Sequence, residues 1–135
     1  MFEVELGINL PLYATHTFET PESLKLGKDA ERYIYSIQAY NQNLPQTKEF
    51  IRKHKEKYGQ EPSVFSGFSY DATMLLAGAL RVCGNDSDCV KSFLYQTQGY
   101  QGVSGIKSFD ENGDIKNPIY TLKTVRNSMF IPLEE

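Results

Sequence analysis

The side chains that could carry out chemistry are few in this sequence, and they lie far apart. The 135 residues include two cysteines and two histidines, His16 and His54. Nucleophilic catalysis requires a serine or cysteine beside a histidine that an acid orients. No serine lies in a nucleophile-elbow sequence. We therefore predict no catalytic residues and expect a protein that is not an enzyme.

Two other segments resemble ligand-binding loops only in part. Residues 102–108 contain glycines and a lysine, but the lysine does not follow the last glycine as a phosphate-binding loop requires. Asp110, Asn112 and Asp114 share the alternate spacing of a calcium loop, yet its twelfth position is Thr121 rather than glutamate. A strand entry explains the first segment better, and a tight turn at Asn112 and Gly113 explains the second. We expect no metal and no cofactor.

The two cysteines flank a short polar loop. Cys83 and Cys89 are separated by residues 84–88, a loop short enough to bring their Cα atoms within disulfide distance. Such a bond implies an oxidising compartment. Two unpaired thiols are the alternative, and zinc is disfavoured because neither histidine has motif spacing to the cysteines. We name the pair as a disulfide candidate.

The best candidate for ligand binding is the polar turn at residues 14–18. It follows a short apolar run that predicts a strand, and ligands tend to bind beyond the carboxyl ends of strands in α/β proteins. Thr15, His16 and Thr17 supply hydrogen-bonding groups, and Phe18 supplies an apolar surface. An ordinary polar turn is the alternative.

Composition places the chain among globular proteins with one compact domain as the simplest expectation. Its hydrophobic content is 40% and its charged content 23%. The net charge of -3 provides no cationic field for phosphate backbones, so we expect no nucleic-acid partner. The longest apolar run is shorter than the roughly 20 residues that span a bilayer.

The first residues show no secretory signal, since residues 1–7 have no basic segment followed by an apolar one. Either the protein is cytoplasmic or the sequence lacks its natural beginning. The cysteine pair favours the second explanation. Residues 2–6 followed by Gly7 also resemble the last turn of a helix with a left-handed cap.

The periodicity of apolar residues predicts alternating strands and helices that position these groups. The expected strands cover residues 10–13, 33–37, 102–109, 119–125 and 129–133. The expected helices cover 20–31, 45–59 and 65–82, with a shorter one capped by Ser87 or Asp88 and ending near Thr97. This order predicts an α/β fold with a mainly parallel sheet, followed by antiparallel strands at the C-terminal end.

Four segments in fixed order carry a family resemblance. They are Lys57–Ser63, Phe68–Ala72, Tyr100–Gly105 and Ser108–Asp114, and residues 7–13 and 29–31 extend the likeness toward the N-terminus. Together they resemble the C-terminal portion of type I periplasmic binding proteins, in the branch of branched-chain amino acid transporters and receptor-family ligand-binding regions. The Cys83 and Cys89 pair also resembles bacterial members of this family that have a short disulfide at this position.

The resemblance implies part of a two-lobed α/β protein that closes on a ligand held between its lobes. Residues 1–60 are expected in the C-terminal lobe, 61–117 in the N-terminal lobe, and 118–135 in the C-terminal lobe again. The implied function is the solute-binding component of an ABC importer for branched-chain amino acids or related small polar ligands. Its partners are then the small-molecule ligand and the permease subunits, and its location is the periplasm, as a secreted or lipid-anchored parent.

The family holds the ligand's carboxylate and ammonium groups mainly through loops in its earlier half, which this chain lacks. By resemblance, the turn at residues 14–18 corresponds to a loop that reaches the cleft, where some members place an acidic residue. Here His16 and Thr17 stand at that position, with Glu19 further on.

The same residues allow two alternative functions and also predict that the chain associates with itself. A sensory or receptor ectodomain of the same fold is the first alternative, and a small flavodoxin-like cytoplasmic enzyme is the second. Because parts of two lobes would expose faces that other elements normally cover, we also expect the chain to associate with itself.

Overall fold

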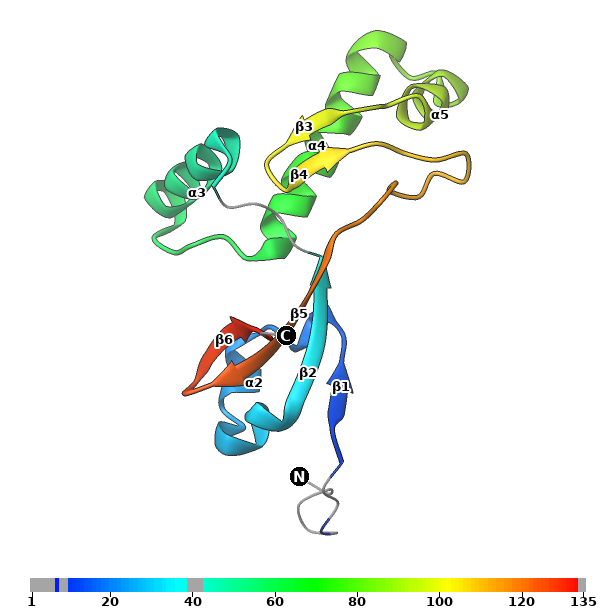
Figure 1. Ribbon diagram of the computed structural model, residues 1–135. Coiled ribbons are helices and arrows are strands. Elements are labelled where there is room, and N and C mark those ends of the chain that lie inside the picture. Colours follow the sequence, from blue (N-terminus) through cyan, green and yellow to red (C-terminus); the bar gives the residue numbers. More distant parts are fainter. Residues whose placement is uncertain (1–6, 8–9, 39–42, 134–135) are drawn as a thin grey trace. The chain divides into compact units, whose positions relative to one another are not determined.

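A computed structural model describes Gly7 and residues 10–38 and 43–133 (Figure 1). These residues form two compact units. Unit 1 contains the described residues up to 38 together with residues 119–133, and unit 2 contains residues 43–118. The helix end predicted at residues 2–6 lies outside the described residues.

Unit 1 is built on a four-stranded sheet with the order β1-β2-β5-β6 (Figure 1). Its strands are β1 (Leu12–Ala14), β2 (Tyr33–Gln38), β5 (Tyr120–Arg126) and β6 (Met129–Pro132). The strands β1 and β2 run parallel, with Ala14 beside Tyr35. The β2–β5 and β5–β6 pairs are antiparallel, and the last residue of β2, Gln38, is paired with the first of β5, Tyr120.

The connection from β1 to β2 consists of three short helical segments. These are η1 (His16–Phe18), α2 (Pro21–Leu24) and η2 (Gly27–Arg32). The predicted start of a helix at residue 20 is confirmed, because the side chain of Thr20 accepts a hydrogen bond from the Ser23 amide and Pro21 occupies the first turn. The single helix expected up to Glu31 is interrupted, because Gly27 adopts a left-handed φ of 61°.

The α/β class and the antiparallel C-terminal strands are confirmed. Parallel pairing within the described residues is confined to β1 and β2. A crossover connection, such as the one between these two strands, permits parallel pairing. The two-residue turn between β5 and β6 requires an antiparallel hairpin, and Asn127 and Ser128 supply its positive φ values of 50° and 59°.

Unit 2 contains three helices and one short ribbon. They are α3 (Pro45–Tyr58), α4 (Val64–Cys83), α5 (Ser87–Tyr95), β3 (Tyr100–Gly102) and β4 (Gly105–Lys107). The predicted ends of α3 are confirmed, with Pro45 in the first turn and Gly59 in the left-handed cap at φ 71°. Helix α4 extends one residue beyond the predicted range at each end. The side chain of Ser63 caps it by accepting a hydrogen bond from the Ser66 amide.

Two local predictions in unit 2 are wrong. The cap of α5 is Asp86, whose carboxylate accepts hydrogen bonds from the amides of Asp88 and Cys89, so neither Ser87 nor Asp88 caps the helix. The single strand expected over residues 102–109 is a ribbon that turns at Val103 and Ser104. The reason is a buried carboxylate from α4 that binds both turn amides.

The boundary between the compact units falls in residues 39–42 on the way out and at residue 118 on the way back. The sequence placed the first crossing near residue 60, which separates α3 from α4. In the structure both helices belong to unit 2. To which lobe of a parent protein each unit belongs stays a prediction.

Candidate functional site

The turn predicted to bind a ligand, residues 14–18, begins with Ala14, the last residue of β1. Phe18 donates its amide to the Thr15 carbonyl at 3.0 Å, and Glu19 donates to the His16 carbonyl at 3.2 Å. These bonds close the single turn of η1. The turn follows β1 in the chain and so lies at the carboxyl end of that strand. Because β1 and β2 are parallel, their carboxyl ends share one edge of the sheet, and α/β proteins bind ligands at such an edge.

The structure brings the three polar residues of this turn together and separates Phe18 from them. Thr15, His16 and Thr17 are exposed. The two threonine hydroxyls form a hydrogen bond of 2.8 Å. Phe18 is partly buried, and its ring stacks on Tyr33 with 4.5 Å between centroids. Phe18 therefore anchors the turn to β2, and the polar residues are presented to solvent.

Glu19, the acidic residue nearest this turn, already has partners. Lys123 of β5 donates to both carboxylate oxygens at 2.7 and 2.8 Å, and the Tyr35 hydroxyl donates at 2.7 Å. Burial, together with the Glu19 carboxylate, raises the pKa of Tyr35 well above its usual value. The charge of Glu19 is thus neutralised within unit 1, and its carboxylate fixes the end of the turn to two strands.

In unit 2, a buried carboxylate joins two of the segments that carry the family resemblance. Asp71 of α4 is 2% exposed and accepts hydrogen bonds of 2.8 Å from the amides of Val103 and Ser104. The Ser104 hydroxyl donates a short hydrogen bond to the same carboxylate. Gly102 is required beside it, because a Cβ there would lie 2.3 Å from Oδ2 of Asp71.

Lys107 completes this buried cluster. It is 6% exposed, donates to the Ser104 carbonyl at 2.8 Å, and lies 5.5 Å from the centroid of the Phe68 ring. Burial lowers the pKa of Lys107, and the nearby Asp71 charge opposes this shift. Each of these polar side chains has a hydrogen-bond partner within the cluster, so we assign it the role of fixing the β3–β4 turn to α4.

A groove of about 690 Å³ lies between α3 and α4 in unit 2. Aromatic rings form much of it, with Phe50 and Tyr70 in contact at 5.1 Å between centroids. Lys53 and Lys57 of α3 also line it.

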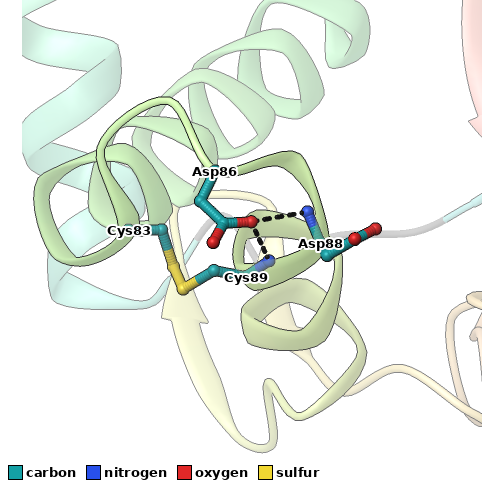
Figure 2. The surroundings of a disulfide bond; sticks show 4 residues. All are labelled: Cys83, Asp86, Asp88 and Cys89. Atoms are coloured by element: carbon teal, nitrogen blue, oxygen red, sulfur yellow. Dashed lines mark hydrogen bonds between the residues drawn. A yellow bond between two sulfur atoms is a disulfide. The ribbon is translucent and has the colours of Figure 1, made fainter.

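The cysteine pair forms the predicted disulfide (Figure 2). Cys83 and Cys89 are bonded with their Cα atoms 5.6 Å apart, a usual separation for a disulfide. Figure 2 shows the Asp86 carboxylate beside this bond, accepting from the amides of Asp88 and Cys89. The bridge therefore joins the end of α4 to the capped start of α5.

The calcium-like spacing belongs to a turn, as the sequence favoured. The Asp110 carboxylate accepts hydrogen bonds of 2.9 Å from the amides of Asn112 and Asp114. Gly113 adopts a φ of 85°. Within the described part of the chain, no three His, Cys, Asp or Glu side chains gather as metal ligands would. Of the described helices, none has the length and apolar content needed to cross a membrane.

Comparison with known proteins identifies the family. The model of the family described as "Periplasmic binding protein" matches residues 4–128. A Leu/Ile/Val-binding protein homolog from Brucella suis is 33% identical over 81 residues, which are 59% of this chain and 22% of that protein.

Solved structures resemble this chain over nearly its whole length. A leucine-binding protein from Thermotoga maritima is 27% identical with a TM-score of 0.82, over 97% of this chain and 38% of that one. An ABC transporter substrate-binding protein from Desulfitobacterium hafniense, solved in complex with Leu, is 26% identical with a TM-score of 0.75 over the same shares. The chain thus spans less than half the length of each of these relatives.

Proposed function

This chain belongs to the periplasmic binding protein family, and from that premise we propose that it is part of the solute-binding component of an ABC importer. The proposed ligands are branched-chain amino acids or related small polar molecules. The observation that carries the proposal is the likeness over 97% of the chain to a substrate-binding protein solved with Leu. The family and fold are those of solute-binding proteins rather than enzymes, and the family implies a periplasmic or extracellular parent.

The polar turn is the part of this chain to which we assign ligand contact. Its support is geometric: Thr15, His16 and Thr17 are exposed at the carboxyl end of a parallel strand. The carboxylate of Glu19 is held by Lys123 and Tyr35, so it is a poor acceptor for a ligand's ammonium group. The turn then offers hydroxyl oxygens, imidazole nitrogen and backbone carbonyls in place of a free carboxylate.

The two compact units fit a protein whose chain passes from one lobe to another and back. We propose that unit 1 is part of one lobe and unit 2 part of the other. The crossings then lie at residues 39–42 and near residue 118, where the units divide. Closure of the lobes on the ligand is the signal that permease subunits would recognise, and these subunits are the proposed protein partners.

A hybrid protein tests ligand binding. The part of a leucine-binding relative that aligns with this chain is replaced by this chain, and leucine binding is measured by titration calorimetry. We expect saturable binding that His16→Ala and Thr17→Ala each weaken by about tenfold, the loss of one good polar contact. The matched control is His54→Ala in unit 2, whose Nδ1 lies 3.0 Å from the Gln60 carbonyl. A folded hybrid that binds no branched-chain amino acid would refute the proposed ligand class.

A further inference from the structure

The acidic residue that directly follows the turn of residues 14–18 is Glu19, and its carboxylate is bound by the sheet of unit 1. Oε1 accepts a hydrogen bond from Lys123 at 2.7 Å, and Oε2 accepts from Lys123 at 2.8 Å and from the Tyr35 hydroxyl at 2.7 Å. Both oxygens are therefore engaged by donors from β2 and β5. The next acidic residue along the chain, Glu22, lies on α2 and pairs with Lys25.

The ion pair between Glu19 and Lys123 is partly shielded from solvent. The Glu19 side chain is 25% exposed and the Lys123 side chain 18% exposed, whereas the side chains of Lys25 and Glu22 are 77% and 73% exposed. Charges in a partly buried pair are screened less by water and salt than those of an exposed pair. Lys123 therefore cancels the negative potential that the Glu19 carboxylate would otherwise create beside the turn.

The exposed hydroxyls of the turn suit an oxygen atom of a ligand. Thr15 and Thr17 share one hydrogen bond of 2.8 Å, and whichever hydroxyl donates, the proton of the other is not used in that bond. The carbonyls of Thr15 and His16 already accept from the amides of Phe18 and Glu19. An ammonium group brings three donors and no acceptor, and it binds most strongly to an ionised carboxylate. The turn instead offers a hydroxyl donor beside a carboxylate that Lys123 neutralises.

We propose that the Glu19–Lys123 ion pair determines ligand specificity by excluding a positively charged ligand group from this turn. The ligand class is then a small branched-chain molecule that presents a hydroxyl or carbonyl oxygen to the turn, such as a 2-hydroxy or 2-oxo acid, in preference to the α-amino acid. An ammonium group would lose part of its hydration at the turn without gaining a compensating negative charge, and this loss disfavours it. The inference rests on the proposed function, because it names the ligand class of the same turn.

The hybrid protein tests this specificity at about pH 7, where the amine of leucine is charged. Titration calorimetry measures the affinity for leucine and for its 2-hydroxy analogue, 2-hydroxy-4-methylpentanoate. The quantity compared between proteins is the ratio of the leucine affinity to the analogue affinity. We expect this ratio to be about tenfold lower in the hybrid than in the intact leucine-binding relative, the effect of one charge-assisted contact.

Two variants of the hybrid break the same ion pair and leave opposite charges behind. Lys123→Met leaves the Glu19 carboxylate unpaired, which attracts an ammonium group, so the ratio should rise by about fivefold or more. Glu19→Gln leaves the Lys123 ammonium unpaired, so the ratio should fall below that of the unchanged hybrid. A purely structural role predicts no such opposition, because both variants lose the same ion pair. The control Lys25→Met removes an equal charge from the exposed pair with Glu22 and should leave the ratio unchanged.

Each result supports or overturns the inference. It is overturned if the hybrid and the intact relative have equal ratios, if Lys123→Met and Glu19→Gln do not shift the ratio in opposite directions, or if Lys25→Met shifts it as much as Lys123→Met. Circular dichroism identifies a variant that fails to fold, and the remaining variant and the unchanged hybrid then decide. If the folded hybrid binds leucine with the ratio of the relative, only the inference fails. If it binds neither leucine nor its 2-hydroxy and 2-oxo analogues, the proposed function fails and the inference fails with it.

Discussion

Replacing Asp71 should destabilise unit 2 more than any other single carboxylate change in the described chain. Its carboxylate is the common acceptor for the amides of Val103 and Ser104 and for the Ser104 hydroxyl. In Asp71→Asn the side chain keeps its shape but exchanges one acceptor oxygen for an NH₂ group. That NH₂ then faces a donor, and at least one buried N–H loses its partner.

The magnitude follows from the number of bonds. A hydrogen bond to a charged group contributes about 1.5–3 kcal/mol, and an unsatisfied buried donor costs about 1–3 kcal/mol. We therefore expect Asp71→Asn to lower the free energy of unfolding by about 2–4 kcal/mol. Loss of this size is a large part of the total stability of an ordinary domain, which is about 5–15 kcal/mol.

Gly102 provides an independent check on the geometry. An added Cβ would lie 2.3 Å from Oδ2 of Asp71 and 2.6 Å from its Cγ. Gly102→Ala should therefore cost about 1–3 kcal/mol through overpacking. In an Asp71→Ala background the clashing atoms are gone, so the added cost of Gly102→Ala should fall by about 1 kcal/mol or more.

Urea unfolding followed by circular dichroism measures these changes. The control is Asp114→Asn, at an exposed position in the turn after β4 whose backbone amide, rather than its side chain, makes the bond to Asp110. We expect that control to change stability by less than about 0.5 kcal/mol. If Asp71→Asn behaves like Asp114→Asn, or if Gly102→Ala costs the same with and without Asp71, the reasoning about this cluster is wrong.

Three further outcomes follow from contacts in the two units. Burial raises the pKa of Tyr35 well above its usual value of about 10, so its stabilising contribution is complete below about pH 10 and is lost as the pH rises further. Urea midpoints from pH 9 to 11 should therefore fall less for Tyr35→Phe than for the unchanged chain, and an equal fall would contradict this. Glu19→Gln, which removes the charge paired with Lys123, should lower stability by about 1 kcal/mol and speed amide exchange at Phe18, with Glu22→Gln as the exposed control. Reducing the Cys83–Cys89 bond should cost about 2 kcal/mol in urea unfolding, and a Cys83→Ser, Cys89→Ser variant should show no response to reductant.

Local signals in the sequence predicted most elements of the fold. Pro45 and Gly59 marked the ends of α3 because proline fixes φ in a first turn and glycine tolerates a left-handed cap. The start of a helix expected at residue 20 is confirmed for a different reason, because the Thr20 side chain caps α2 with a hydrogen bond. The family resemblance then predicted the fold class and the partial character of the chain, which the comparisons confirm.

What the sequence could not provide were contacts between residues far apart in the chain. Glu19 and Lys123 are 104 residues apart, and nothing local indicates that they are paired. The ribbon turn at Val103 also depends on a distant residue. The alternation of apolar residues predicted one continuous strand, whereas the Asp71 carboxylate, 32 residues away in the chain, binds the Val103 amide in the turn. Ligand contact by Phe18 stays a prediction, and the stacking of its ring on Tyr33, 15 residues further along the chain, is a contact that no local signal indicates.

The pairing of Gln38 with Tyr120 has a mechanical consequence. These residues are the last of β2 and the first of β5, and the whole of unit 2 is inserted between them. Tension applied through unit 2 therefore acts on one end of the β2–β5 ladder and opens its hydrogen bonds one after another, like a zipper. Tension applied along the strands would load all of those bonds together. In a single-molecule experiment, unit 1 should yield at a much lower force when held through residues 38 and 120 than when held through Tyr33 and Tyr120.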